Sequence, residues 1–145
     1  ERPDLPPACF VQMGDFLRYA LDEAVAQGLR QVVIGGMVGK LTKIAQGETI
    51  THANRAEVDT QLLADLAASL GAPPADCAAI AAAETARFAA ERMEALGLSA
   101  PFHTALARAV VRTLMAPARY GGQFQLHVLV CDFDGRKVAE AFSHD

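Results

Sequence analysis

Apolar residues recur every three to four positions along most of this chain, and that spacing predicts helices. The clearest stripe starts at residue 14 or 15 and runs to 27, with apolar side chains at i, i+3, i+4 and i+7 and Gly28 as a stop. An alanine-rich stretch over residues 75–96 can restart at Thr85. Further helices are predicted over residues 41–46, 57–70 and 99–115.

Four short runs have the pattern of strands. Residues 8–11 and 31–34 are apolar runs typical of buried strands, whereas 124–131 alternate between apolar and polar positions. The Asp-Gly turn chemistry of residues 132–135 predicts a hairpin that returns over 137–142. The early strand–helix–strand order favours a parallel crossover. We therefore predict an α/β fold, a small and mostly parallel sheet with a C-terminal antiparallel hairpin, flanked by about five helices.

Length and composition fit one domain. The chain has 145 residues, of which 52% are hydrophobic, enough for a core without disulfides. Residues 1–7 are polar and proline-rich like a linker, so we treat 8–145 as one domain. Because the first residue is not methionine, we expect a piece of a longer protein. The chain shows no signal peptide and no apolar run of about 18 residues, so we expect a cytoplasmic location and no membrane span.

Charge and metal-binding residue types narrow the function classes. A formal charge of −4 argues against a dedicated nucleic-acid binder, which would carry a basic stripe. Cys9, Cys77 and Cys131 are widely spaced, which predicts reduced, buried thiols rather than disulfides or a zinc site. The histidines fall on separate elements, so we expect no protein-bound metal. His103 should lie on the exposed face of its helix and His127 on the surface of the sheet.

The densest candidate chemistry follows the predicted strand at residues 31–34. Glycine permits positive φ and a close approach of backbone to ligand, and lysine supplies a mobile positive charge. Ligands of open α/β sheets bind where strands end. The spacing fits neither a Walker A motif nor GxGxxG. It predicts an anion-binding loop, with a tight turn that holds no ligand as the alternative. The residues concerned are Gly35, Gly36, Gly39, Lys40 and Lys43.

Polar residues around this loop are candidates for acid–base chemistry and binding. Thr51, His52 and Arg55 fall on a predicted loop, where histidine can donate hydrogen bonds or move protons. Asp15 and Glu57 are candidate bases or acceptors for a ligand hydroxyl. Structural roles stay open for both carboxylates, since Asp15 could cap a helix and Glu57 would suit the positive end of one.

Three motifs occur in a fixed order and with characteristic spacing: Gln12-Met13-Gly14-Asp15-Phe16, Gly36-Met37-Val38-Gly39-Lys40-Leu41-Thr42-Lys43 and Thr51-His52. Together they resemble the CbiD family of cobalt-precorrin-5B C1-methyltransferases. Glu84-Thr85 is similar to a family position where a threonine interrupts a helical region. Family members are much longer and begin with a threonine- and glycine-rich segment that this chain lacks.

The match departs from the family pattern at four positions. Asp15 stands where the family has asparagine, and Ala53 where it has serine. Glu57 replaces an aspartate and Asp59 an arginine. These departures count against any catalytic role that requires an arginine at position 59. The resemblance implies that this chain is the C-terminal domain of such an enzyme and holds part of its active site.

The resemblance implies methylation of C1 of cobalt-precorrin-5B, with S-adenosyl-L-methionine as methyl donor, to give cobalt-precorrin-6A in anaerobic cobalamin biosynthesis. The implied partners are the corrinoid and the missing N-terminal domain, and homo-oligomerisation stays open. Lys40, Lys43 and Arg55 would anchor the substrate's carboxylates. His52 would be the first candidate for proton transfer, before Glu57 or Asp15.

A different class of function fits the same residues. The chain could be a non-catalytic module that binds a carboxylate-rich small molecule such as a corrinoid. Such a module would bind the corrinoid without affinity for the methyl donor.

Overall fold

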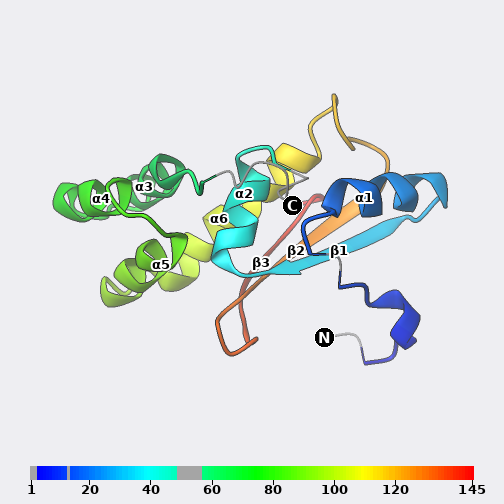
Figure 1. Ribbon diagram of the computed structural model, residues 1–145, viewed down its shortest axis with the longest axis horizontal. Helices are drawn as coiled ribbons and strands as arrows, with labels where there is room; N and C mark the ends of the chain where they lie inside the picture. Colours follow the sequence, from blue (N-terminus) through cyan, green and yellow to red (C-terminus); the bar gives the residue numbers. More distant parts are fainter. Residues whose placement is uncertain (1–2, 13, 49–56) are drawn as a thin grey trace.

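The computed structural model describes residues 3–12, 14–48 and 57–145, in which helices pack on one face of a three-stranded sheet (Figure 1). None of the helices in these ranges is both long and apolar enough to cross a membrane. In chain order the elements are η1 (Pro7–Cys9), α1 (Leu17–Ala26), β1 (Gln31–Gly36), α2 (Val38–Ala45), α3 (Thr60–Ser69), α4 (Pro74–Ala81), α5 (Ala86–Ala95), α6 (Ser99–Leu114), β2 (Gln125–Cys131) and β3 (Lys137–Phe142).

The sheet has the order β1-β2-β3, in which β1 is parallel to β2 and β2 is antiparallel to β3. Ile34 of β1 is in register with Val128 of β2, which in turn faces Ala141 of β3. The Asp132 carboxylate closes the β2–β3 turn by accepting hydrogen bonds from the N–H groups of Asp134 (2.9 Å) and Arg136 (2.8 Å). The predicted α/β fold and its C-terminal hairpin are confirmed.

The strand predicted over residues 8–11 is wrong. Pro7–Cys9 form a 3₁₀ turn, and Phe10 and Val11 are 60% and 71% exposed. Proline suits the first turn of a helix because its fixed φ fits there and its missing N–H is not needed. Cys9 is exposed rather than buried, whereas Cys77 and Cys131 are partly buried, and all three thiols are free. An apolar run therefore marked an exposed segment here, not a core strand.

The core lies between the sheet and α6. Leu106 and Val110 project from α6 and are fully buried, as are Val128 and Val130 on the facing side of β2. Burial of an aliphatic side chain of this size contributes about 1.5–3 kcal/mol each. The helix predicted over residues 99–115 is confirmed. α1 packs on the same face through Leu17, Leu21 and Ala24.

The helices α3, α4 and α5 form a lobe beside the sheet (Figure 1). The predicted restart at Thr85 is confirmed, because its hydroxyl accepts a hydrogen bond from the N–H of Phe88 (3.3 Å) and begins α5. Ile80 of α4 is buried within this lobe, whereas Phe88 of α5 is 37% exposed. α3 begins at Thr60, not at residue 57, because the Asp59 side chain accepts from the N–H of Leu62 and acts as its N-cap.

Candidate functional site

A cavity of about 370 Å³ lies at the carboxyl end of β1, between the start of α2, the start of α5 and the β2–β3 turn. This is the edge of an α/β sheet where ligands bind. Lysine and arginine side chains share its wall with apolar groups and with one acidic residue, Glu84. The lining of this cavity includes Met37, Lys40, Lys43, Thr85, Arg87 and Phe133.

The predicted glycine loop is the end of a strand followed directly by a helix. Gly35 and Gly36 belong to β1 and Gly39 to α2, and none of the three has a positive φ. The left-handed backbone that glycine permits is therefore not used at these three positions. The expected close approach holds at Gly36, where an added Cβ would lie 3.2 Å from Cδ2 of Leu41. At Gly35 and Gly39 an added Cβ would meet open space.

The N-terminus of α2 contributes to the electrostatics of the cavity. Its N-cap residue, Met37, provides no side-chain hydrogen bond to the first N–H groups of the helix. The uncapped N-terminal end of a helix carries a partial positive charge and favours anions. Gly39 and Lys40, in the first turn, both line the cavity.

The two lysines of α2 differ in their surroundings. The ammonium group of Lys40 forms an ion pair with the carboxylate of Asp15, which comes from the segment before α1. Among the residues that the structure describes, Lys43 has no carboxylate partner. Within the described part of the chain, Lys40 thus shares its charge with a carboxylate and Lys43 does not.

The opposite wall is held together by a contact that sequence reasoning missed. The Arg87 guanidinium lies over the ring of Phe133, 4.4 Å from its centre, and so joins α5 to the β2–β3 turn. Arg87 also pairs with Glu91 (Nε–Oε1 2.7 Å), as the i, i+4 spacing predicts. No feature of the sequence indicates that residues 87 and 133 lie close together. The sequence indicates only the i, i+4 pair of Arg87 with Glu91.

The remaining site candidates lie in different places. Asp15 does not cap α1, which begins at Leu17 after Phe16 without a side-chain cap. Glu57 is exposed and precedes α3, and the Gln46 side-chain amide donates to its backbone carbonyl (3.0 Å). Thr51, His52 and Arg55 lie outside the described residues.

His103 is buried, not exposed as predicted. It is 8% exposed in the first turns of α6, where Nδ1 donates to the carbonyl of Ser99 (2.8 Å). Its ring meets Phe102 edge-on, with 5.5 Å between ring centres. Burial lowers the pKa of His103 below its ordinary value, so the neutral ring is favoured.

His127 lies on the sheet surface, as predicted, on the side away from α6. Its Nε2 is 2.8 Å from a carboxylate oxygen of Glu140, and its ring stacks on Phe142 with 4.0 Å between centres. Hydrogen bonds from His127 and Lys137 hold the pKa of Glu140 below its usual range. Within the described ranges, no group of three or more histidine, cysteine, aspartate or glutamate side chains is placed to hold a metal ion.

Part of the chain is similar to a known protein family. Residues 50–142 match the family described as "CbiD, C-terminal domain". The chain belongs to the CbiD family. This CbiD match begins after α2, so it does not include the two lysines of the cavity.

Curated relatives extend the CbiD similarity over almost the whole chain. The cobalt-precorrin-5B C(1)-methyltransferase of Paracidovorax citrulli is 82% identical over 143 residues, covering 99% of this chain and 38% of the relative. The protein of the same name from Methylococcus capsulatus is 63% identical over 145 residues, covering 100% and 38%. That from Salinispora tropica is 42% identical over 139 residues, covering 94% and 36%. The CbiD chain thus spans well under half the length of these relatives. No solved structure matches it.

Proposed function

We propose that this chain is the C-terminal domain of a methyltransferase that transfers a methyl group from S-adenosyl-L-methionine to C1 of cobalt-precorrin-5B, giving cobalt-precorrin-6A. The observation that carries the proposal is the 82% identity, over 143 residues, to a protein named cobalt-precorrin-5B C(1)-methyltransferase. Because this chain spans 38% of that relative, the rest of the protein is expected to supply the rest of the active site.

The cavity at the end of β1 supports a role in holding the substrate's carboxylates. A corrinoid of this pathway carries several acetate and propionate groups, whereas the methyl donor carries one carboxylate. Three basic side chains, Lys40, Lys43 and Arg87, line the cavity together with one acidic residue, Glu84, and this excess of basic groups suits the substrate with more anionic groups. Lys43 is the first anchor, because Lys40 and Arg87 already pair with Asp15 and Glu91.

The proposed methyl transfer depends mainly on the alignment of the donor's methyl group with the ring carbon that attacks it. The methyl group of the donor is already activated as a sulfonium, so the protein must hold a nucleophilic ring carbon in line with it. Fixing carboxylates at the edge of a rigid macrocycle fixes the position of its ring carbons. His52 stays the first candidate for any proton transfer, because Asp15 is engaged by Lys40 and the exposed Glu57 does not line the cavity.

The test uses the complete protein, cobalt-precorrin-5B and methyl-labelled donor, with label in the corrinoid followed by mass spectrometry. Lys43→Ala removes the anchor, and Arg108→Ala on the exposed side of α6 is the matched control for loss of one positive charge. A hydrogen bond to a charged group contributes about 1.5–3 kcal/mol, and the lower end applies at a partly exposed site. We therefore expect roughly tenfold lower kcat/KM for Lys43→Ala, mostly through KM.

Two results would contradict different parts of the proposal, one the binding site and the other the catalytic function. If Lys43→Ala and Arg108→Ala had the same kinetics as the wild type, the methyltransferase would stand but its substrate would bind elsewhere. If the folded wild-type protein transferred no label but bound the corrinoid, the chain would belong to a non-catalytic binding module.

A further inference from the structure

Among the residues that the structure describes, no helix covers one face of the sheet. α1 and α6 cover the face that carries Ile34, Val128 and Ala141, all of which are buried. The opposite face carries Val33, which is 52% exposed although it lies in the middle of the parallel β1–β2 pair. Parallel strands are normally buried on both faces. We call this surface the open face and define it by Val33, His127, Leu129, Glu140 and Phe142.

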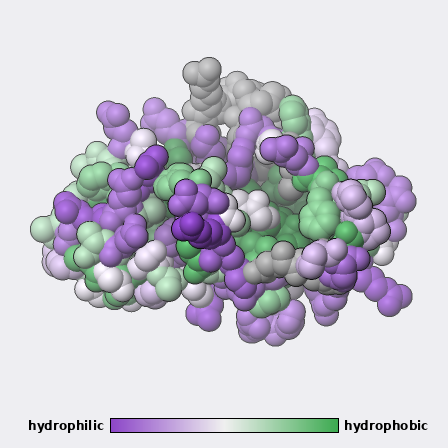
Figure 2. Space-filling model, turned by 90° about the horizontal axis from the view of Figure 1, so that it is seen from below, coloured by the Kyte–Doolittle hydropathy of each residue, from purple (hydrophilic) through white to green (hydrophobic). Residues whose placement is uncertain are grey.

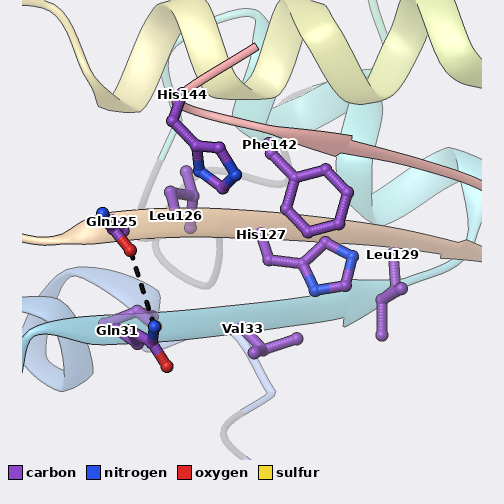
Figure 3. A pocket seen from close by; sticks show the side chains of 9 residues that line it. Gln31, Val33, Gln125, Leu126, His127, Leu129, Phe142 and His144 are labelled. Carbon is purple, nitrogen blue, oxygen red and sulfur yellow. Dashed lines mark hydrogen bonds between the residues drawn. The ribbon is translucent and has the colours of Figure 1, made fainter.

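The open face is apolar at its centre. Figure 3 shows Val33, Leu129 and Phe142 together with His127 around one shallow hollow, which has a volume of about 270 Å³. Seen from below, hydrophobic side chains gather in a depression over the sheet, and hydrophilic side chains surround them (Figure 2). A concave apolar patch with a polar border marks an interaction surface rather than ordinary solvent-facing sheet.

The polar groups of the open face are already paired with one another. His127 and Glu140 share a hydrogen bond of 2.8 Å, and Lys137 donates to the same carboxylate at 3.2 Å. Burying a charged group is costly unless it keeps a partner. Because these partners come from β2 and β3 themselves, a surface that covers the face need not supply them.

The relatives are longer than this chain, and their additional residues are the candidate for what covers the open face. This chain is 38% of the Paracidovorax citrulli protein and carries the match to the C-terminal domain, so most of the remaining residues of that relative precede it. In a complete protein the preceding polypeptide would lead into residues 3–12, the first residues that the structure describes. This segment lies on the side of β1 away from α1 (Figure 1), with Phe10 and Val11 exposed.

We infer that the open face is the docking surface for the N-terminal part of the complete protein. This assignment rests on membership of the family and on the bare sheet, not on the proposed reaction. It implies that β1, β2 and β3 are the middle layer of a three-layer arrangement. It also implies that His127 and Glu140 are buried at the interface between the two parts.

The test measures thiol reactivity in the complete protein. Val33→Cys places a thiol at the centre of the open face, and Leu29→Cys places one in the turn before β1, where the wild-type side chain is equally exposed at 51%. Each rate of alkylation by N-ethylmaleimide is measured by peptide mass spectrometry and divided by its rate in denaturant. We expect Val33→Cys to react about tenfold or more slowly than Leu29→Cys, because only the first is covered.

Equal rates for the two thiols would overturn the assignment. The partly buried Cys77 reports on folding in the same spectra, so an unfolded variant is recognised directly. A benzophenone on Gln31→Cys, at the rim of the hollow, then identifies the occupant. Cross-links to the preceding part of the same chain support the assignment, and cross-links to a second copy overturn it in favour of self-association.

Discussion

The three glycines at the end of β1 should respond differently to alanine. An added Cβ at Gly36 would lie 3.2 and 3.3 Å from Cδ2 and Cγ of Leu41. Leu41 is fully buried, so its side chain cannot move out of the way into solvent. Overpacking of this kind costs about 1–2 kcal/mol, and the lower entropy of the unfolded alanine chain offsets about 0.4–1 kcal/mol. We expect Gly36→Ala to destabilise the chain by about 0.5–1 kcal/mol.

Gly35→Ala and Gly39→Ala are the matched controls. Neither glycine has a positive φ, and an added Cβ at either position meets nothing within 4 Å. Only the unfolded-state effect remains, so each substitution should stabilise the chain by about 0.4–1 kcal/mol. The sign of the effect therefore separates Gly36 from its two neighbours.

Urea unfolding followed by circular dichroism measures the series. The free energy of unfolding falls by about 1–3 kcal/mol per molar urea, and we expect the same slope for all three variants. The urea concentration at the unfolding midpoint should then be roughly 0.5–1 M lower for Gly36→Ala than for Gly35→Ala and Gly39→Ala. If Gly36→Ala were as stable as Gly35→Ala, the packing of Leu41 against the end of β1 would be refuted. In the complete protein, a Gly39→Ala variant that is more stable but turns over more slowly would indicate that a ligand approaches the backbone there.

Three further predictions concern single side chains. Thr85→Ala removes the N-cap of α5 and should cost about 0.5–1 kcal/mol, seen as a melting temperature lower by roughly 2–4 °C, whereas Thr85→Ser should melt like the wild type. Because burial lowers the pKa of His103 below 6.5, its contribution to stability is complete above that pH and is lost as the pH falls through the folded-state value. His103→Asn should therefore lose less stability than the wild type between about pH 7 and pH 5, as measured by urea midpoints. Burial and the hydrogen bond to Asp22 (2.7 Å) raise the pKa of Tyr120 to about 12, so its contribution is present below pH 10 and is lost as the pH rises to about 12. The late tyrosinate transition in an absorbance titration should be missing from Tyr120→Phe, and its survival would show that the wrong tyrosine was assigned.

Local patterns in the sequence predicted the elements whose cause is local. The apolar stripe of α6 extends through four turns, which is long enough to exclude a strand. The β2–β3 turn depends on Asp132 and the glycine at 135, both visible as turn chemistry. The break at Thr85 is likewise set by one hydroxyl and the N–H three residues later. Each of these features lies within a few residues of its own signal.

Features that depend on distant partners could not be predicted. Residues 8–11 have the composition of a strand but pair with none in the described structure. The burial of His103 was missed as well, although its hydrogen bond to the Ser99 carbonyl and its ring contact with Phe102 are both local. The Arg87–Phe133 contact joins two elements that the sequence holds far apart. The sequence therefore predicted the lysines of the cavity, which follow β1 directly, but not the wall formed by α5 and the β2–β3 turn.

The parallel pairing of β1 with β2 also has a consequence for the order of folding. Gln31 faces Gln125 across 94 positions of sequence, and α2 to α6 lie between them. Long-range strand pairing of this kind is slow because the entropy of closing a large loop is lost before the contacts form. Of the intervening helices, α3 and α4 are neighbours in sequence that pack on each other, so this pair can form first. The cavity takes one wall from the end of β1 and another from the turn after β2, so it exists only once that loop has closed. A chain cut within α3–α5 could keep its helical content and still never assemble the site.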